Sequence, residues 1–182
     1  KMAIRMPDAL KTERDEIDEN DWQEIQQQIN EALAKIKEFR IAEGASLEKE
    51  FVMRIENIRS LMNSAVALDS ERIETVKTRL RTAIEDLKAT VDENRYEQEL
   101  IYYLEKYDIT EERVRLDNHL NYFLETMQVE GSNGRKLGFI VQEMGREINT
   151  MGSKANHSEM QKMVVQMKDE LEKIKEQILN VL

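Results

Sequence analysis

The sequence predicts an all-α protein: a long antiparallel helical hairpin followed by a compact C-terminal helical bundle. The first observation is composition, since 182 residues include one proline, six glycines and 5% aromatic residues, whereas 35% are charged. This composition is typical of proteins built from long helices. The second is that apolar residues recur at three- and four-residue steps, the period of one helix face. The third is that no segment shows the apolar–polar alternation of a strand.

The first predicted helix follows the acidic stretch 18–21, whose side chains suit a helix N-terminus. Its apolar face consists of Trp22, Ile25, Ile29, Leu33, Ile36 and Phe39. Gly44 is expected to end this helix, and Ser46 is expected to cap the next one. The second helix then runs to residue 87 with a break near 67–70, roughly 40 residues or about 60 Å. A small globule cannot bury so long a stripe, so the two helices are expected to pair and to form an oligomerisation arm.

The polar run 91–94 predicts a boundary, which divides the chain into three regions. Residues 1–17 are expected to be the tail of a missing N-terminal domain, 18–92 the helical arm, and 93–182 a C-terminal helical domain. Within the C-terminal domain, helices are predicted over 95–107, 110–127 and 134–152. Asp108 or Thr110 is expected to cap the second of these, and its residues Val114, Leu116, Leu120, Phe123, Leu124 and Met127 are expected to form a buried stripe. The last helix carries a heptad stripe: Met160, Val164, Met167, Leu171, Ile174, Ile178 and Val181.

The balance of charge restricts the function classes. A formal net charge of −10 and a pI near 4.9 argue against general nucleic-acid binding, so a nucleic acid would have to meet a local basic face. The absence of cysteine excludes disulfides and thiolate metal sites and fits a reducing cytoplasm. No apolar run reaches about 18 residues and no signal peptide is visible, so no membrane partner is expected.

The segment 134–154, GRKLGFIVQEMGREINTMGSK, carries the strongest functional pattern. Glu143 and Glu147 lie one helical turn apart, among the basic residues Arg135, Lys136, Arg146 and Lys154. Neighbouring carboxylates suit a hard cation, and interleaved Arg and Lys suit phosphate groups. The pattern therefore predicts metal-assisted chemistry on nucleic acid. The alternative is a solvated helix face with i,i+4 ion pairs.

Two further helices carry polar stripes that could line the same cleft of a bundle. Arg95 and Glu99 lie one turn apart on the first, while Glu112, Arg115 and His119 share a stripe on the second. A histidine with several carboxylates favours Mn²⁺ or Mg²⁺, which can activate water next to a phosphate. Equally, His119 could be an ordinary half-buried histidine, and the arginines could only neutralise nearby carboxylates.

From Arg95 onward the sequence resembles the C-terminal domain of the YicC/YloC family of bacterial endoribonucleases. The resemblance rests on RYEQE (95–99), DITEERVRLDNHL (108–120), the segment 134–154 and MKDELEKIKEQILNV (167–181). It implies a single-strand-directed RNA endonuclease that needs a divalent metal, assembles as a hexamer, and acts in the cytoplasm on small or messenger RNAs, with DNA not expected. The family's own N-terminal domain would be almost wholly missing.

The positions that match the family's motifs supply the candidate site. From their chemistry, the predicted metal ligands and catalytic groups are Glu99, His119, Glu143 and Glu147. The predicted RNA-binding residues are Arg95, Arg115, Arg135, Lys136, Arg146 and Lys154. The sequence departs from the commonest pattern at Gly138, Gly145 and His157, where relatives often carry Asp, Asn and an acid.

A second function class stays open beside the nuclease. An acidic, non-enzymatic helical scaffold or oligomerisation module would show the same apolar stripes, used as seams between subunits, and the same polar clusters, used as ion pairs. The tyrosines at 102, 103 and 107 are similarly ambiguous, because they could stack on bases or pack within the fold.

Overall fold

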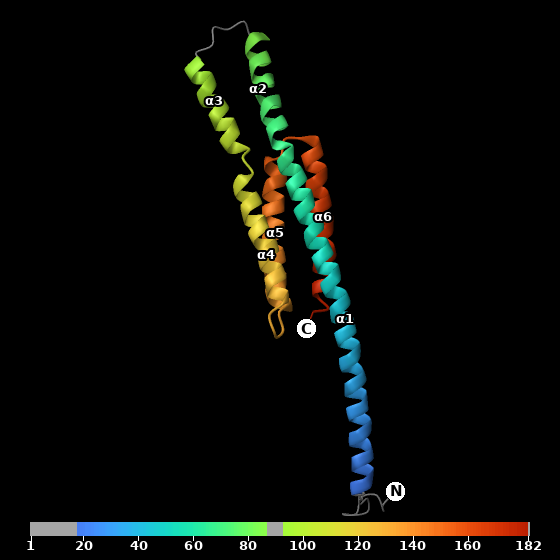
Figure 1. The fold of residues 1–182 in the computed structure, drawn as a ribbon. Coiled ribbons are helices and arrows are strands. Elements are labelled where there is room, and N and C mark those ends of the chain that lie inside the picture. The colour runs from blue at the N-terminus through green and yellow to red at the C-terminus, as the bar shows by residue number, and fades with distance from the viewer. Residues whose placement is uncertain (1–17, 87–92, 182) are drawn as a thin grey trace, which may run out of the picture. The chain divides into compact units, whose positions relative to one another are not determined.

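The computed structural model describes residues 18–86 and 93–181, and these residues form six α-helices and no strand (Figure 1). The helices are α1 (Glu19–Ala67), α2 (Asp69–Asp86), α3 (Glu93–Lys106), α4 (Thr110–Met127), α5 (Gly134–Lys154) and α6 (Ser158–Ile178). The prediction of an all-α fold is confirmed. The predicted tail at 1–17 and the first part of the boundary at 91–94 lie outside the described residues, so the proposed domain limits stay predictions.

The expected turn at Gly44 is wrong, because α1 continues through it for 49 residues. A glycine inside a helix costs only about 1 kcal/mol relative to alanine, which is too little to end a helix without a competing partner for its backbone. A Cβ added at Gly44 would meet nothing within 4 Å. The expected break near 67–70 is confirmed, since α1 ends at Ala67 and α2 begins at Asp69. The chain runs in opposite directions along α2 and α3 (Figure 1), and the ends of these helices nearest the bundle are joined by the hydrogen bond from Arg72 to the carbonyl oxygen of Tyr107.

The chain divides into two compact units, residues 1–43 and 44–182. The described part of the first unit is the beginning of α1, where every residue is exposed. Its apolar stripe therefore has no partner within the unit, and Trp22, Leu33 and Phe39 are 50%, 57% and 68% exposed.

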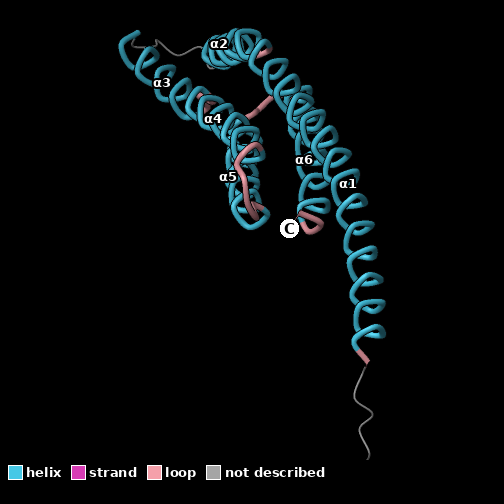
Figure 2. The backbone as a smooth tube through the Cα atoms, turned by 60° about the horizontal axis from the view of Figure 1, so that its bottom comes forward, coloured by secondary structure: helices cyan, strands magenta, loops and turns pink. Residues whose placement is uncertain are grey.

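The second unit contains a four-helix bundle made by α1 from Gly44 onward with α4, α5 and α6 (Figure 2). Its core is apolar, and Phe51 of α1 meets Phe123 of α4 edge to face with ring centroids 5.7 Å apart. The predicted heptad stripe of α6 is confirmed, because its members from Met160 to Ile178 are all buried. In α4 the buried residues include Leu116, Leu120 and Phe123, but Val114 is 48% exposed and does not belong to the stripe.

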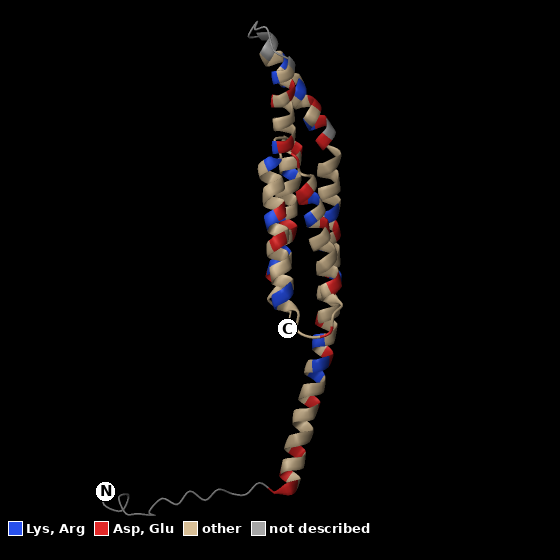
Figure 3. Cartoon of the chain, turned by 90° about the vertical axis from the view of Figure 1, so that its left-hand side faces the viewer, with Lys and Arg blue, Asp and Glu red and all other residues tan. Residues whose placement is uncertain are grey.

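Ion pairs at the edge of this core fix α1 against its neighbours. Arg54 of α1 pairs with Glu170 of α6 at 3.1 Å, and Asn57 donates a hydrogen bond to the same carboxylate. Although burial raises the pKa of Glu170, hydrogen bonds from Lys173, Asn57 and Arg54 together lower it to about 2. On the other side Arg59 pairs with Asp117 of α4. Elsewhere charges of both signs are interspersed along the helices (Figure 3).

The expected cap of α4 at Asp108 or Thr110 is wrong, because the N-cap residue is Ile109, which makes no side-chain cap. Asp108 lies one residue earlier, and its carboxylate accepts hydrogen bonds from the backbone N–H and the hydroxyl of Thr110 at 2.9 and 2.7 Å. These two bonds lower the pKa of Asp108. None of the described helices is long and apolar enough to cross a membrane.

Candidate functional site

Helices α4 and α5 run antiparallel, and the line along which they meet is called here the α4–α5 seam. Two contacts set its register. At one end Lys154 of α5 reaches Glu112 of α4 at 2.7 Å, and at the other the ammonium of Lys136 of α5 lies 4.8 Å from the ring centroid of Tyr122 of α4. The seam therefore pairs the beginning of α4 with the end of α5.

Three of the four predicted catalytic residues lie on this seam between the two contacts. His119 follows Glu112 by two helical turns and precedes Tyr122 by one, so it shares their face of α4. Glu143 and Glu147 follow Lys136 by two and three turns on the facing flank of α5. His119 and both glutamates are half-buried, and among the described residues neither His119 nor Glu147 has a hydrogen-bond or ion-pair partner.

The arginines of the seam are held by carboxylates of their own helices. Arg146 pairs with Glu143 at 3.0 Å, and their side chains are 64% and 41% exposed. Arg115 pairs with Glu111 of α4 and not with the buried Glu112. Such exposed pairs contribute about 0–1 kcal/mol, so both guanidinium groups stay accessible to a stronger anion.

Lys154 differs from the other predicted RNA-binding residues. Its partner Glu112 has a side chain only 5% exposed, and the second oxygen of that carboxylate has no partner among the described residues. A buried carboxylate needs its counter-charge. The ammonium of Lys154 therefore stabilises the fold by neutralising the buried carboxylate of Glu112.

Glu99 and Arg95 are exposed on α3 and are not on the seam. Helices α3 and α4 follow one another end to end (Figure 1), and residues 99 and 119 lie on different sides of the turn between them. Over 18–86 and 93–181 no three His, Asp or Glu side chains come close enough to hold a metal ion. Within one chain the structure brings His119, Glu143 and Glu147 onto the seam but not Glu99, because the turn at 107–109 separates α3 from the bundle. That these four residues share a cation stays a prediction.

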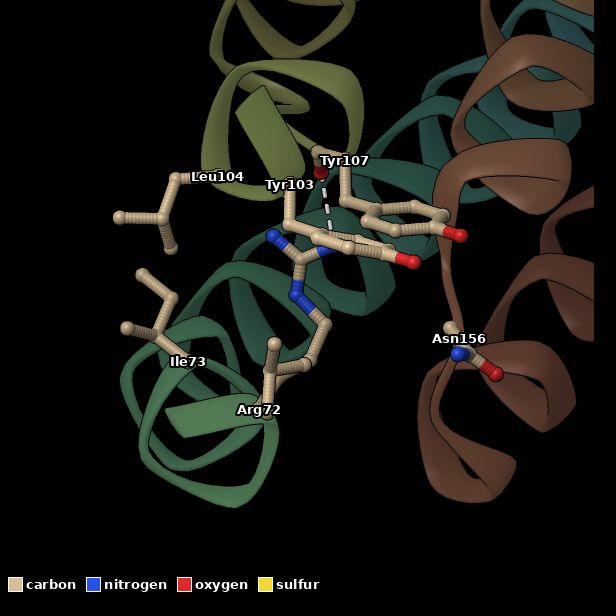
Figure 4. A pocket seen from close by; sticks show the side chains of 7 residues that line it. Arg72, Ile73, Tyr103, Leu104, Tyr107 and Asn156 are labelled. Atoms are coloured by element: carbon tan, nitrogen blue, oxygen red, sulfur yellow. Dashed lines mark hydrogen bonds between the residues drawn. The ribbon is translucent and has the colours of Figure 1, made fainter. Parts of the chain in front are cut away.

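A buried arginine makes the junction between the arm and the bundle (Figure 4). Arg72 of α2 is 4% exposed and donates hydrogen bonds to the carbonyl oxygens of Tyr107 and Lys154, at 2.6 and 3.3 Å, while pairing with Asp69. It thereby satisfies backbone acceptors at the ends of α3 and α5 that their helices leave open.

The tyrosines of α3 lie around this junction. Tyr103 and Tyr107 stack with ring planes 17° apart and, with Arg72 and Asn156, line a hollow of about 10 Å³. A hollow of this size has room for about one water molecule. Packing is thus the role that the structure supports for Tyr103 and Tyr107, whereas Tyr102 is 57% exposed beside Lys106.

The glycines of α5 belong to a different flank from the seam. A Cβ at Gly145 would lie 3.2 Å from Leu171 of α6, and one at Gly152 would lie 2.9 Å from Val164 of α6. Gly138 also faces α6, with Ile178 at 4.0 Å. The departures from the commonest family pattern at 138 and 145 therefore remove no side chain from the seam.

Sequence reasoning missed two seam residues and the junction. Tyr122 and Phe139 are 45% and 57% exposed, and neither belongs to the motif's charged residues. The signal for Phe139 was available, since it falls between the buried positions Leu137 and Ile140. Arg72 left no signal, because a basic residue on an amphipathic helix is normally solvated.

Comparison with known proteins covers nearly all of the chain. The family model described as "Endoribonuclease YicC-like, C-terminal" matches residues 65–182, and that described as "Endoribonuclease YicC-like, N-terminal region" matches residues 1–49. The chain is 37% identical over 183 residues to a "Probable endoribonuclease YicC" of Clostridioides difficile (strain 630) and 27% identical over 179 residues to one of Haemophilus influenzae. In each case 98% of this chain is aligned, and it spans 62% of the relative's length.

Proposed function

Because the chain belongs to the YicC-like endoribonuclease family, we propose that it cleaves single-stranded RNA internally, with the α4–α5 seam as its site. The observation that carries this proposal is that the family match over 65–182 contains the whole seam, with His119, Glu143 and Glu147 on it. The proposed substrates are small or messenger RNAs in the cytoplasm.

The seam offers the groups that phosphodiester cleavage requires. An imidazole such as that of His119 has the chemistry of a general acid or base. The guanidinium groups of Arg115 and Arg146 suit phosphate oxygens on which negative charge develops. Each is held only by an exposed carboxylate, which an RNA phosphate can displace.

A divalent metal, Mn²⁺ or Mg²⁺, is part of the proposal, but the donors of one chain do not fit it. Glu143 and Glu147 are the one pair of predicted ligands that shares a helix flank, and no third His, Asp or Glu among the described residues completes a site with them. We propose that the remaining ligands come from RNA phosphates, water or another copy of the chain. Titration calorimetry with Mn²⁺ in the presence and absence of RNA, on the wild type and on Glu147→Gln, tests this directly.

The alternative function is a non-enzymatic acidic scaffold. The observation that favours it is the apolar stripe from Trp22 to Phe39, which is exposed over its whole length. Exposed apolar patches of this extent mark interaction surfaces. The stripe also supports assembly into a homo-oligomer, for which a hexamer is proposed, so it is compatible with both functions.

The deciding experiment is cleavage of a labelled single-stranded RNA by the full chain, with Mn²⁺ and with EDTA. The nuclease proposal expects products that EDTA suppresses. Glu143→Gln should keep the oligomer and lower the cleavage rate about 100-fold or more, the scale of a lost catalytic group. Glu159→Gln is the matched control, since Glu159 is an exposed carboxylate in the same i,i+3 arrangement, with Lys162 on α6. Equal activity of the two variants would remove Glu143 from the site, and absence of cleavage at every metal concentration would support the scaffold.

A further inference from the structure

The end of the α4–α5 seam nearest the 128–133 connection exposes two aromatic rings, each beside a cation. Phe139 of α5 is 57% exposed, and the guanidinium carbon of Arg135 lies 5.8 Å from its ring centroid. Tyr122 of α4 is 45% exposed, and the ammonium of Lys136 lies 4.8 Å from its ring centroid. Single exposed apolar residues are ordinary, but here two large rings and two cations occupy adjoining positions on neighbouring helices.

These four residues continue the seam. Phe139 precedes Glu143 by one helical turn and Arg146 by two, so it shares their flank of α5. Tyr122 follows His119 by one turn on α4. A strand that crossed the aromatic pair and continued along the seam would next meet the imidazole, the carboxylates and Arg146.

We infer that Tyr122 and Phe139, with Arg135 and Lys136, form a base-stacking platform for single-stranded RNA next to the cleavage site. The inference rests on the proposed function for the identity of the ligand, and it adds how the strand is held. Proteins that bind single strands without sequence preference combine cations along the backbone with aromatic faces for the bases. The platform has both, although the whole chain carries a net charge of −10.

The same chemistry disfavours two other occupants. A duplex keeps its bases stacked within the helix and cannot offer them to exposed rings. A protein partner would have to bury the ammonium of Lys136 together with the rings, and lysine is depleted from protein interfaces. Single-stranded RNA satisfies both halves of the platform, because its phosphates pair with the cations and its bases cover the rings.

Binding of a short labelled oligouridylate, measured by fluorescence anisotropy in a Glu143→Gln background, tests the platform without cleavage. Phe139→Leu and Tyr122→Leu remove the rings and should each weaken binding about tenfold, the scale of one lost base–aromatic stack. Phe139→Trp keeps a stacking face and should bind like the parent. Val165→Ala on α6 is the control, since Val165 is 55% exposed and lies off the seam. All three positions are exposed, so folding should survive, which circular dichroism checks.

An abasic strand of the same length separates stacking from charge. The parent should bind it about 100-fold more weakly than the uridylate, because both stacks are lost, and Phe139→Leu, which keeps Tyr122, should show only about a tenfold difference between the two strands. Equal affinity of the parent for the two strands, or unchanged binding by Phe139→Leu, would overturn the inference. A fall in oligomer mass by sedimentation velocity for Phe139→Leu, with RNA binding intact, would also overturn it and make this face a protein interface. Ring-dependent binding without any cleavage by the wild type would defeat the nuclease proposal alone.

Discussion

Lys154 belongs to the basic residues of the motif, but its ammonium is already paired with a carboxylate of the bundle. Its basic neighbours in the motif are exposed, whereas Lys154 is 28% exposed and neutralises Glu112, which is buried. Removing one member of such a pair leaves an unpaired buried charge, which is far more costly than the pair is favourable. A loss of RNA binding on mutation of Lys154 would therefore have to be separated from a loss of fold.

Lys154→Met should lower the free energy of unfolding by about 2–4 kcal/mol, because it strands the Glu112 carboxylate in the bundle. Adding Glu112→Gln should recover much of that loss, since the uncharged amide costs less to bury. Urea unfolding followed by circular dichroism measures both. Lys162→Met is the control, because Lys162 is 70% exposed and its pair with Glu159 is solvated; it should change stability by less than about 1 kcal/mol. A Lys154→Met variant as stable as this control would contradict the assignment.

The two flanks of α5 have different tasks. Its seam flank presents Phe139, Glu143, Arg146 and Glu147, whereas Gly138, Gly145 and Gly152 lie against α6. The glycines permit a close approach, since the added Cβ at position 152 would stand 2.9 Å from a methyl group of Val164, inside normal contact distance. The motif therefore encodes both a site and a packing surface on one helix.

The contacts of the α5 glycines predict that replacing them with alanine changes stability by different amounts. Gly152→Ala should destabilise the protein by about 1–3 kcal/mol, because Val164 must shift in a packed core. Gly138→Ala is the internal control: its Cβ meets only Ile178 at 4.0 Å, so the better helix propensity of alanine should leave stability unchanged or raised by up to about 1 kcal/mol. The midpoint temperatures of thermal unfolding measure which variant is the more stable. An unaffected Gly152→Ala would mean that α5 and α6 lie farther apart than described.

At the scale of the whole molecule, the first part of α1 exposes an extended apolar stripe. Its six apolar residues, Trp22, Ile25, Ile29, Leu33, Ile36 and Phe39, are between 43% and 68% exposed. They follow the spacing of a helix that packs against a partner. The proposed homo-oligomer would cover them.

Trp22 is the single tryptophan of the chain, so its fluorescence reports on this surface directly. If another copy covers the stripe, emission should be shifted to the blue at high protein concentration and should move to the red on dilution. Ile29→Glu should lower the oligomer mass in sedimentation velocity, because it places a charge in an apolar contact. Ala34→Glu adds the same charge on the opposite face and should have no effect. Emission typical of water at every concentration, with a monomeric mass, would exclude the assembly.

Local sequence patterns were enough to predict which segments form the helices of the bundle. The apolar period gave α4, α5 and α6 and the buried stripe of α6 from Met160 to Ile178, since the 3.6-residue repeat is a property of neighbours in the chain. It also placed His119 on one face of α4, and Glu143 and Glu147 together on one face of α5. The predicted helix end at Gly44 was wrong, because a glycine weakens a helix but ends it only where the flanking residues have other partners to bind.

Which faces meet was settled by packing between distant segments. The turn at 107–109 carries Glu99 away from His119, and no period along α3 or α4 encodes the direction of that turn. Likewise, Lys154 is bound to Glu112, and Phe139 is left in solvent beside Arg135, because α5 docks on α4 with one flank and on α6 with the other. Periodicity defines a face for each helix, whereas the neighbour of that face depends on the free energy of the assembled core.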